Sequence, residues 1–224
     1  MPNKWIYLSY PLDENTPAYG GGKGFERRYE KSIAMGDSCN TATWSFSNHL
    51  GTHLDFPRHF VAHGRTMDDY SIDSFIFRRI GIVDLGKVEG SRIITWEDLE
   101  SANLSGNIEI LLVKTGFCYM RDSTTYWQEN SGFSPDLADC LRKAFPSLRV
   151  IGFDSISLSS FSHRELGSEA HKNFLDHKRP LLLLEDMDLA GISADCQVNQ
   201  VIVAPWMVHE ADAVPCTVMA EVCK

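Results

Sequence analysis

The stretch from His49 to His59 packs three histidines and one carboxylate into eleven residues, HLGTHLDFPRH. Histidine is otherwise scarce, with eight in a chain of 224 residues. His49, His53, Asp55 and His59 all occupy odd positions. Because successive side chains of an extended strand point to opposite faces, a strand here would present all four side chains to one side of a sheet.

A helix fits the same stretch less well, because it would turn Asp55 away from the histidines and because Gly51 and Pro57 are unfavourable inside a helix. A straight strand separates positions 49 and 53 by roughly 13 Å, which is far for two imidazoles that bind one ion. We therefore expect a kink or bulge at Gly51. Pro57 cannot donate to a strand ladder, so we expect pairing to stop there and His59 to stand on a turn at the rim.

These four side chains are of the types that bind divalent metals. Neutral imidazole and carboxylate are the usual ligands of Zn²⁺, Mn²⁺ and related ions. The alternative is a set of surface histidines on an amphipathic strand. Four potential ligands on one face, with Gly51 where the geometry needs a bend, favour the metal site.

The overall composition limits the possible partners and compartments. Hydrophobic residues are 43% of the chain and charged residues 23%, an ordinary globular balance. The net charge of −9 argues against binding to nucleic acid or an anionic membrane. We see no apolar run that could cross a bilayer and no signal-peptide core at the N-terminus. The six scattered cysteines fit reduced thiols, so we expect a cytoplasmic protein.

Apolar periodicity predicts strands and helices along the whole chain. Helices are predicted from Trp96, over 135–144, and over 169–178 with Ser168 as the cap. Strands are predicted over 5–10, 39–48, 80–85, 108–113, 148–153, 181–184, 199–206 and 214–222. The strand–helix alternation in the middle and the strand-rich ends predict an α/β fold, a single compact domain over residues 1–224 with a mixed, partly closed barrel-like β-sheet flanked by helices.

Two N-terminal segments lead into the histidine stretch. Residues 11–37 contain a glycine run without a phosphate-binding pattern, and we expect a mobile loop that could cover the site. In the predicted strand 39–48, Trp44 and Phe46 alternate with polar residues. We expect these two aromatic side chains to be buried, so that the opposite face continues into His49 and holds the ligands rigidly.

The pattern His49-x-Gly-Thr-His-x-Asp-x-Pro-x-His59 closely resembles the signature of the cyclase family of metal-dependent hydrolases, which includes bacterial kynurenine formamidases and isatin hydrolases. The resemblance extends over most of the chain. Similar segments are Gly36-Asp37-Ser38, Gly152–Ser157, Ala170-His171, Leu183–Met187, Ala204-Pro205-Trp206 and Ala211–Pro215.

The resemblance implies roles for individual residues and a compact α/β domain that is often a homodimer. His49, His53 and Asp55 would bind the primary metal, and His59 would be a catalytic base or a group that supports the ligands. The resemblance also implies that His171 and Glu185 complete the site, with one or two zinc or manganese ions per subunit. From the residues alone, His171 would be an exposed helix residue and Glu185 a solvated strand end.

The function that we expect from this resemblance is metal-assisted hydrolysis of an amide-type C–N bond in a small molecule, either an arylformamide or a cyclic amide. Phe56 stands where the family commonly has alanine, and it is the best aromatic candidate for contact with the substrate. Two alternatives stay open. One is a metal-dependent lyase or cyclase that acts through an enolate, and the other is a non-catalytic metal-binding protein.

Overall fold

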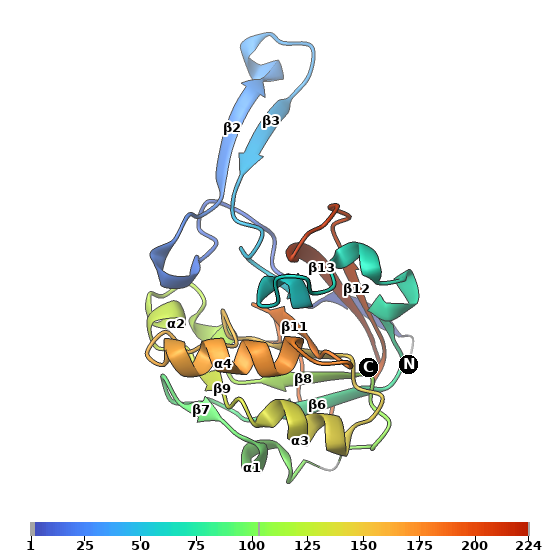
Figure 1. Cartoon of the computed structure of the whole chain (residues 1–224). Coiled ribbons are helices and arrows are strands. Elements are labelled where there is room, and N and C mark those ends of the chain that lie inside the picture. Colours follow the sequence, from blue (N-terminus) through green and yellow to red (C-terminus); the bar gives the residue numbers. More distant parts are fainter. Residues whose placement is uncertain (1–2, 103, 224) are drawn as a thin grey trace.

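A nine-stranded mixed sheet forms the body of the molecule, and the computed structural model describes residues 3–102 and 104–223 (Figure 1). The strand order is β5-β12-β13-β4-β11-β10-β8-β6, with β1 beside β13. The strands are β1 (Lys4–Tyr7), β4 (His53–Asp55), β5 (Ile76–Phe77), β6 (Ile80–Asp84), β8 (Ile110–Lys114), β10 (Val150–Phe153), β11 (Leu182–Glu185), β12 (Val198–Pro205) and β13 (Ala213–Val222). Because β12 also contacts β6, the sheet curls into a nearly closed barrel, which confirms the predicted α/β class.

Strand β4 joins two halves of the sheet that differ in strand direction. On one side, β11, β10, β8 and β6 run parallel to one another. On the other side, β13 is antiparallel to both β12 and β1. β4 pairs antiparallel with β11 and with β13, so both of its edges are hydrogen-bonded. All three of its residues are buried, and this central position fixes the side chains that they carry.

Two apolar clusters fill the two faces of the sheet. In β8, Ile110 and Leu112 belong to one cluster, whereas Leu111 and Val113 belong to the other. A strand that is covered on both faces forms a nearly continuous apolar run, which is the pattern that predicts this strand from the sequence. The first cluster lies with β12 and β13, and the second is covered by helices.

Four α-helices are present in the described residues, and α3 and α4 lie along one face of the sheet (Figure 1). The helices are α1 (Trp96–Leu99), α2 (Thr125–Gln128), α3 (Leu137–Ala144) and α4 (Arg164–Leu175), and a small parallel pair is formed by β7 (Ile93–Ile94) and β9 (Gly132–Phe133). The prediction that Ser168 caps the last helix is wrong, because α4 begins at Arg164. Glycine is unfavourable inside a helix, but Gly167 lies inside α4. Any Cβ at this position would overlap Ser159.

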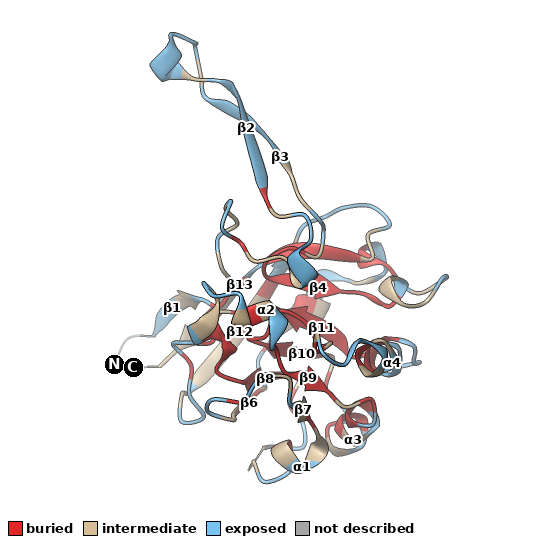
Figure 2. Cartoon of the chain, turned by 90° about the vertical axis from the view of Figure 1, so that its left-hand side faces the viewer, coloured by how far each residue is buried: buried red, intermediate tan, exposed pale blue. Residues whose placement is uncertain are grey.

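A two-stranded arm projects from the body between the first strand and the histidine stretch (Figure 1). It consists of β2 (Glu26–Lys31) and β3 (Thr41–Ser45), which pair antiparallel. Every residue of β2 is exposed, and Figure 2 shows most of the arm in the colour of exposed residues. The prediction that residues 11–37 form a loop is therefore wrong over β2.

The prediction that Trp44 and Phe46 belong to the core is also wrong. Trp44 is 56% exposed, and both rings pack against Phe25 at the base of the arm, with centroid distances of 6.1 and 5.4 Å. β3 ends at Ser45, and turns separate it from β4, so the predicted strand does not continue into His49. Alternation of apolar and polar residues shows that a strand has two different faces, but it does not show what each face packs against.

No helix in the described part of the chain has the length and apolar character needed to span a membrane. The six cysteines are all free thiols.

Candidate metal centre

The centre is built around the pairing of β4 with β11. His53 and Asp55 are two residues apart on β4, so their side chains share one face. Glu185 ends β11 and lies directly opposite His53 in the antiparallel register. His53 Nε2 is 3.4 Å from Asp55 Oδ1 and 3.5 Å from Glu185 Oε2. The three side chains form one group whose potential ligand atoms all lie within 4.8 Å of one another.

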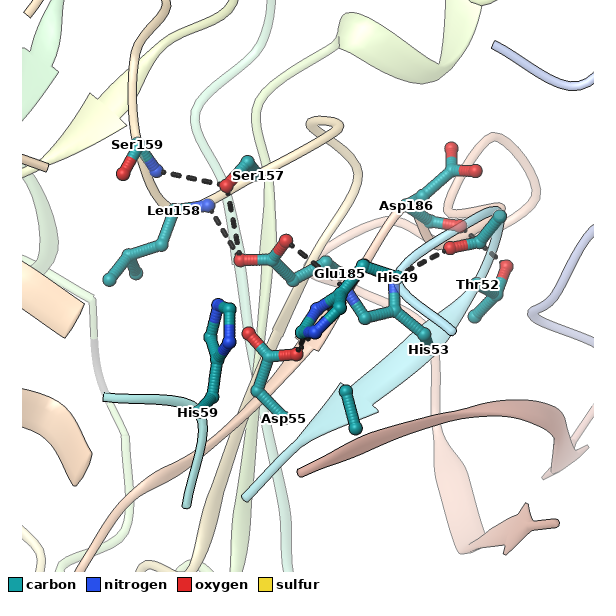
Figure 3. A network of polar contacts seen from close by, with 12 residues as sticks. His49, Thr52, His53, Asp55, His59, Ser157, Leu158, Ser159, Glu185 and Asp186 are labelled. Carbon is teal, nitrogen blue, oxygen red and sulfur yellow. Dashed lines mark hydrogen bonds and ion pairs between the residues drawn. The ribbon is translucent and has the colours of Figure 1, made fainter. Parts of the chain in front are cut away.

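His49 and His59 approach this group from the turns on either side of β4 (Figure 3). Gly51 has φ of +70°, so the expected kink is present, and a Cβ there would overlap Leu12. His59 ends a 3-10 turn that begins at Pro57, where pairing was expected to stop. His49, Asp55 and His59 form a second possible ligand group, and His49 Nδ1 is 3.1 Å from Asp55 Oδ1.

His171 comes from α4 and completes the cluster. Its Nε2 is 3.5 Å from Glu185 Oε1 and 3.9 Å from Asp55 Oδ2. Its Nδ1 is 2.9 Å from the carbonyl of Gly167, which fixes the ring orientation. Its ring stacks on Phe60 with centroids 4.6 Å apart. His171 and Glu185 are both buried, so the prediction from the residues alone that they are exposed is wrong. His171 lies beside both Asp55 and Glu185.

Uncompensated buried atoms indicate that a cation belongs in this cluster. Asp55 Oδ1, Asp55 Oδ2 and His53 Nε2 are buried and accept or donate no hydrogen bond within the described chain. A buried carboxylate without a partner is costly unless it is paired or binds a metal. His49 Nδ1 and His53 Nε2 lie 3.1 and 3.4 Å from Asp55 Oδ1, so they neutralise the carboxylate only when their rings are protonated. The donor set fits a divalent metal, and Asp55 is shared by both possible ligand groups.

The carboxylates shift the pKa values of the histidines. Burial alone would lower the pKa of His53, but Asp55 and Glu185 outweigh it and raise the pKa to about 9. Neighbouring carboxylates also outweigh burial at His49 and at His171, so the pKa of each is raised. Burial would raise the pKa of Asp55, but His49 and His53 hold it well below its usual range. Without a cation, protons would therefore supply the positive charge that this cluster needs.

Loading the metal-free protein with Zn²⁺ at pH 7 is expected to release about one proton or more per subunit. His53, with a pKa of about 9, carries a proton at pH 7, and it must lose that proton to bind a metal. The number of protons released per metal ion should decrease as the pH rises through 9. The apparent metal affinity should weaken as the pH falls. Isothermal titration calorimetry in buffers of different ionisation enthalpy measures the release. Metal binding at pH 7 without proton release would contradict the prediction.

Asp212 also belongs to the centre, although the sequence pattern did not predict it. Its Oδ2 lies 3.1 Å from His49 Nε2 and 3.5 Å from His59 Nδ1. Asn48 Nδ2 donates to its Oδ1 at 2.9 Å, which fixes the carboxylate. Asp212 thus holds two histidine rings at once. Its signal in the sequence is the acidic residue in the Ala211–Pro215 segment, directly before β13.

A second buried network lies behind the ligands. Asp186 follows Glu185 with φ of +52°, and its carbonyl accepts a hydrogen bond of 2.5 Å from Thr52, the neighbour of His53 (Figure 3). Its carboxylate receives two hydrogen bonds from Arg121, at 2.9 and 2.6 Å. The network therefore ties together the two residues that adjoin the ligands on β4 and β11.

The cluster opens into a cavity of about 320 Å³. The cavity is lined by Tyr19, His49, His53, His59, Phe60, Ile156, Ser157, Ser159, Arg164, Ser168, His171 and Glu185. A larger cavity of about 540 Å³ lies between β6 and α1, but it contains neither of the two possible ligand groups. The smaller cavity is therefore the candidate substrate site.

The expectation that Phe56 contacts a substrate is not supported by its position. Phe56 is fully buried, and its ring packs against Tyr70 and Phe75 with centroid distances of 5.3 and 6.4 Å. It follows Asp55, so it points to the opposite face of the sheet, towards the core. Phe60, four residues further on, lines the cavity instead.

Comparison with known proteins places this centre in a family. The family model named Cyclase matches residues 6–160, which is more than half of the chain. The chain belongs to the cyclase family. Kynurenine formamidase of Geobacillus thermodenitrificans (strain NG80-2) is 30% identical over 193 residues, which cover 86% of each chain. Kynurenine formamidase of Delftia acidovorans (strain DSM 14801 / SPH-1) is 27% identical over 210 residues, which cover 93% of this chain and 92% of the relative.

Solved structures share the cyclase fold over nearly the whole chain. Isatin hydrolase A from Labrenzia aggregata, bound to benzyl benzoate, superimposes with a TM-score of 0.83 at 18% identity, covering 99% of this chain and 94% of that one. A structure of a potential metal-dependent hydrolase with cyclase activity gives a TM-score of 0.78 at 20% identity, with full coverage of both chains. At these identities the likeness establishes the fold.

Proposed function

We propose that the protein is a metal-dependent hydrolase that cleaves an amide-type C–N bond in a small arylformamide or cyclic amide. The observation that carries the proposal is the position of Asp55. Its two buried oxygens have no hydrogen-bond partner among the described residues, and it is shared by two possible ligand groups beside one cavity. The kynurenine formamidase relatives and the isatin hydrolase fold support this type of reaction.

The ligands that we propose for the metal are His49, His53 and Asp55, with His171 and Glu185 completing the site. When bound there, a Zn²⁺ or Mn²⁺ ion supplies Lewis-acid chemistry, because it polarises the scissile carbonyl and lowers the pKa of water. The sharing of Asp55 supports two ions per subunit.

His59 is the residue that we propose to move protons. It lines the cavity, and its Nδ1 lies 3.5 Å from Asp212, which orients the ring. Burial and the neighbouring His49 and His171 lower the pKa of His59. The imidazole is therefore neutral at neutral pH, and it is able to accept a proton from the attacking water and pass one to the leaving nitrogen.

The test is turnover of N-formylkynurenine and of isatin by protein loaded with Zn²⁺ or Mn²⁺, each with and without a chelator. Chelator-sensitive hydrolysis of either compound would support the proposal and identify the substrate class and the metal. Product analysis separates hydrolysis from an enolate-based lyase or cyclase reaction. Bound metal without turnover of any amide would contradict the proposed reaction and favour the non-catalytic alternative.

We also propose that the protein works as a homodimer in the cytoplasm, with the arm as its contact surface. An isolated two-stranded hairpin is marginally stable in water, so the arm needs a partner. Large apolar side chains are exposed along it, namely Tyr29, Ile33, Met35 and Trp44. β2 also carries arginine and lysine together with glutamate, and a surface with both charges is able to pair with its own copy about a two-fold axis.

Replacing Ile33 and Met35 together by aspartate is expected to convert the dimer to a monomer. Two charges would be desolvated in the contact, and apolar burial would be lost. Light scattering after size-exclusion chromatography measures the molar mass. Ile72→Asp is the matched control, because Ile72 is a similarly exposed apolar residue on the body. A wild-type protein that is monomeric at micromolar concentration, or a double variant that stays dimeric, would contradict the arm contact.

A further inference from the structure

The cavity beside the metal centre contains one arginine, Arg164. Among the described residues that line this cavity, Arg164 is the only lysine or arginine. No carboxylate within the described chain forms an ion pair with it. Its guanidinium lies over the ring of Phe161, 4.0 Å from the centroid, so aromatic packing holds the side chain. Its five N–H donors are therefore free to bind a ligand.

The hydroxyl of Tyr19 is a second possible hydrogen-bond donor, and Tyr19 lines the same cavity. The Tyr19 oxygen is buried and has no hydrogen-bond partner in the described chain. Its ring packs edge-on against Phe161, with centroids 5.8 Å apart. Tyr19 and Arg164 are therefore neighbours of the same ring, since the Arg164 guanidinium also lies over Phe161. Burial raises the pKa of Tyr19, and the charge of Arg164 opposes this shift. A buried hydroxyl without a partner is costly, and a ligand that accepts its hydrogen bond would remove that cost.

The chemistry of these donors selects the ligand. A guanidinium matches the planar geometry of a carboxylate and binds it with two parallel hydrogen bonds. Phe60 and Ile156 line the same cavity with apolar side chains, which suit a flat ring. The histidines and Glu185 of the metal centre line that cavity too, so one small molecule is able to reach both regions.

We propose that Arg164 and Tyr19 form a subsite for a carboxylate on the substrate, separate from the amide bond that is cleaved. The preferred substrate is then an aromatic amide that carries a carboxylate group. This inference rests on the proposed function, because it assigns the substrate class of the same cavity. Arg164 and Tyr19 act in specificity, since they contact the substrate away from the reacting atoms.

The test uses a matched pair of substrates, 3-(formylamino)benzoate and 3-(formylamino)benzamide, which differ in charge but hardly in shape. In the metal-loaded Arg164→Gln variant, kcat/KM for the carboxylate should fall by about 10- to 100-fold, mainly through KM. For the carboxamide it should change by less than about threefold. Arg164→Lys should keep part of the preference, and Tyr19→Phe should lose less than Arg164→Gln. Lys172→Gln, which changes a cation elsewhere on α4, is the control.

A binding measurement separates failure of the subsite from failure of the hydrolase proposal. Benzoate and benzamide are titrated into metal-free protein by calorimetry. Benzoate should bind more tightly than benzamide, and Arg164→Gln should remove the difference. If the variant binds benzoate as the wild type does, the protonated histidines are the anion site and the inference is overturned. If neither formamide is hydrolysed while benzoate binding depends on Arg164, the subsite stands and the proposed reaction is wrong.

Discussion

His53→Ala is expected to abolish tight metal binding and to lower turnover by at least about 1,000-fold. His53 is buried on β4, and its Nε2 lies 3.4 Å from Asp55 Oδ1 and 3.5 Å from Glu185 Oε2. After its loss, His49 and His171 still lie beside Asp55 and Glu185, so we expect the remaining side chains to bind protons instead of metal. Chelator competition measures metal affinity, and hydrolysis of N-formylkynurenine or isatin measures turnover.

His63→Ala is the matched control for this variant. His63 lies four residues after His59 on an exposed turn, and it belongs to neither of the possible ligand groups. It should keep both metal and turnover. Circular dichroism must show that both variants are folded at the assay temperature. If folded His53→Ala protein keeps wild-type metal affinity, the assignment of β4 as the ligand strand is wrong.

His59→Ala is expected to retain metal and to lower kcat by about 10²- to 10⁴-fold, the usual contribution of a positioned acid–base group. His59 stands on the turn after β4 and is partly exposed to the cavity, whereas the ligands on β4 are buried. Metal content by atomic spectroscopy and kcat from steady-state kinetics give the two readouts. Added imidazole should restore part of the turnover, because a small base is able to enter the space left by the side chain.

A second role is open to His59, that of a metal ligand, because His49, Asp55 and His59 also form a possible ligand group. If His59→Ala loses metal together with turnover, His59 is a ligand and another group must move the proton. Full turnover in the variant would exclude both roles. His209→Ala, at an exposed histidine that contacts Asp68, should match the wild type in both readouts.

The placement of His53 and Asp55 could be predicted from the sequence, because it depends only on the conformation of neighbouring residues. Side-chain alternation places His53 and Asp55 on one face of a strand, and a glycine with positive φ bends the chain at position 51. By contrast, the strand predicted over 39–48 is present as β3 (Thr41–Ser45), but it lies in the arm and not in the main sheet. The same alternation that suits a sheet strand also occurs in the arm, where Trp44 packs against Phe25 rather than the core.

His171 shows how one boundary error can hide a ligand candidate. The buried positions of α4 are Gly167, Ala170, His171, Phe174 and Leu175. Their spacing forms a regular helical stripe that begins with the glycine. When the helix is placed after Ser168, that stripe loses its first member and His171 no longer stands out. Asp212 was harder to assign, because it reaches the histidines only through the pairing of β13 with β4, a contact between distant parts of the chain.

The place of β4 between the two halves of the sheet has a consequence for how the protein matures. Its partners β11 (Leu182–Glu185) and β13 (Ala213–Val222) come long after it in the sequence and are synthesised later. The strand pairings that enclose Asp55 are therefore complete only after residues 213–222 have been synthesised. A nascent chain would hold His49, His53 and Asp55 without Glu185 or Asp212. We therefore expect the full set of proposed ligands to be available to a metal only after both strand pairings of β4 have formed.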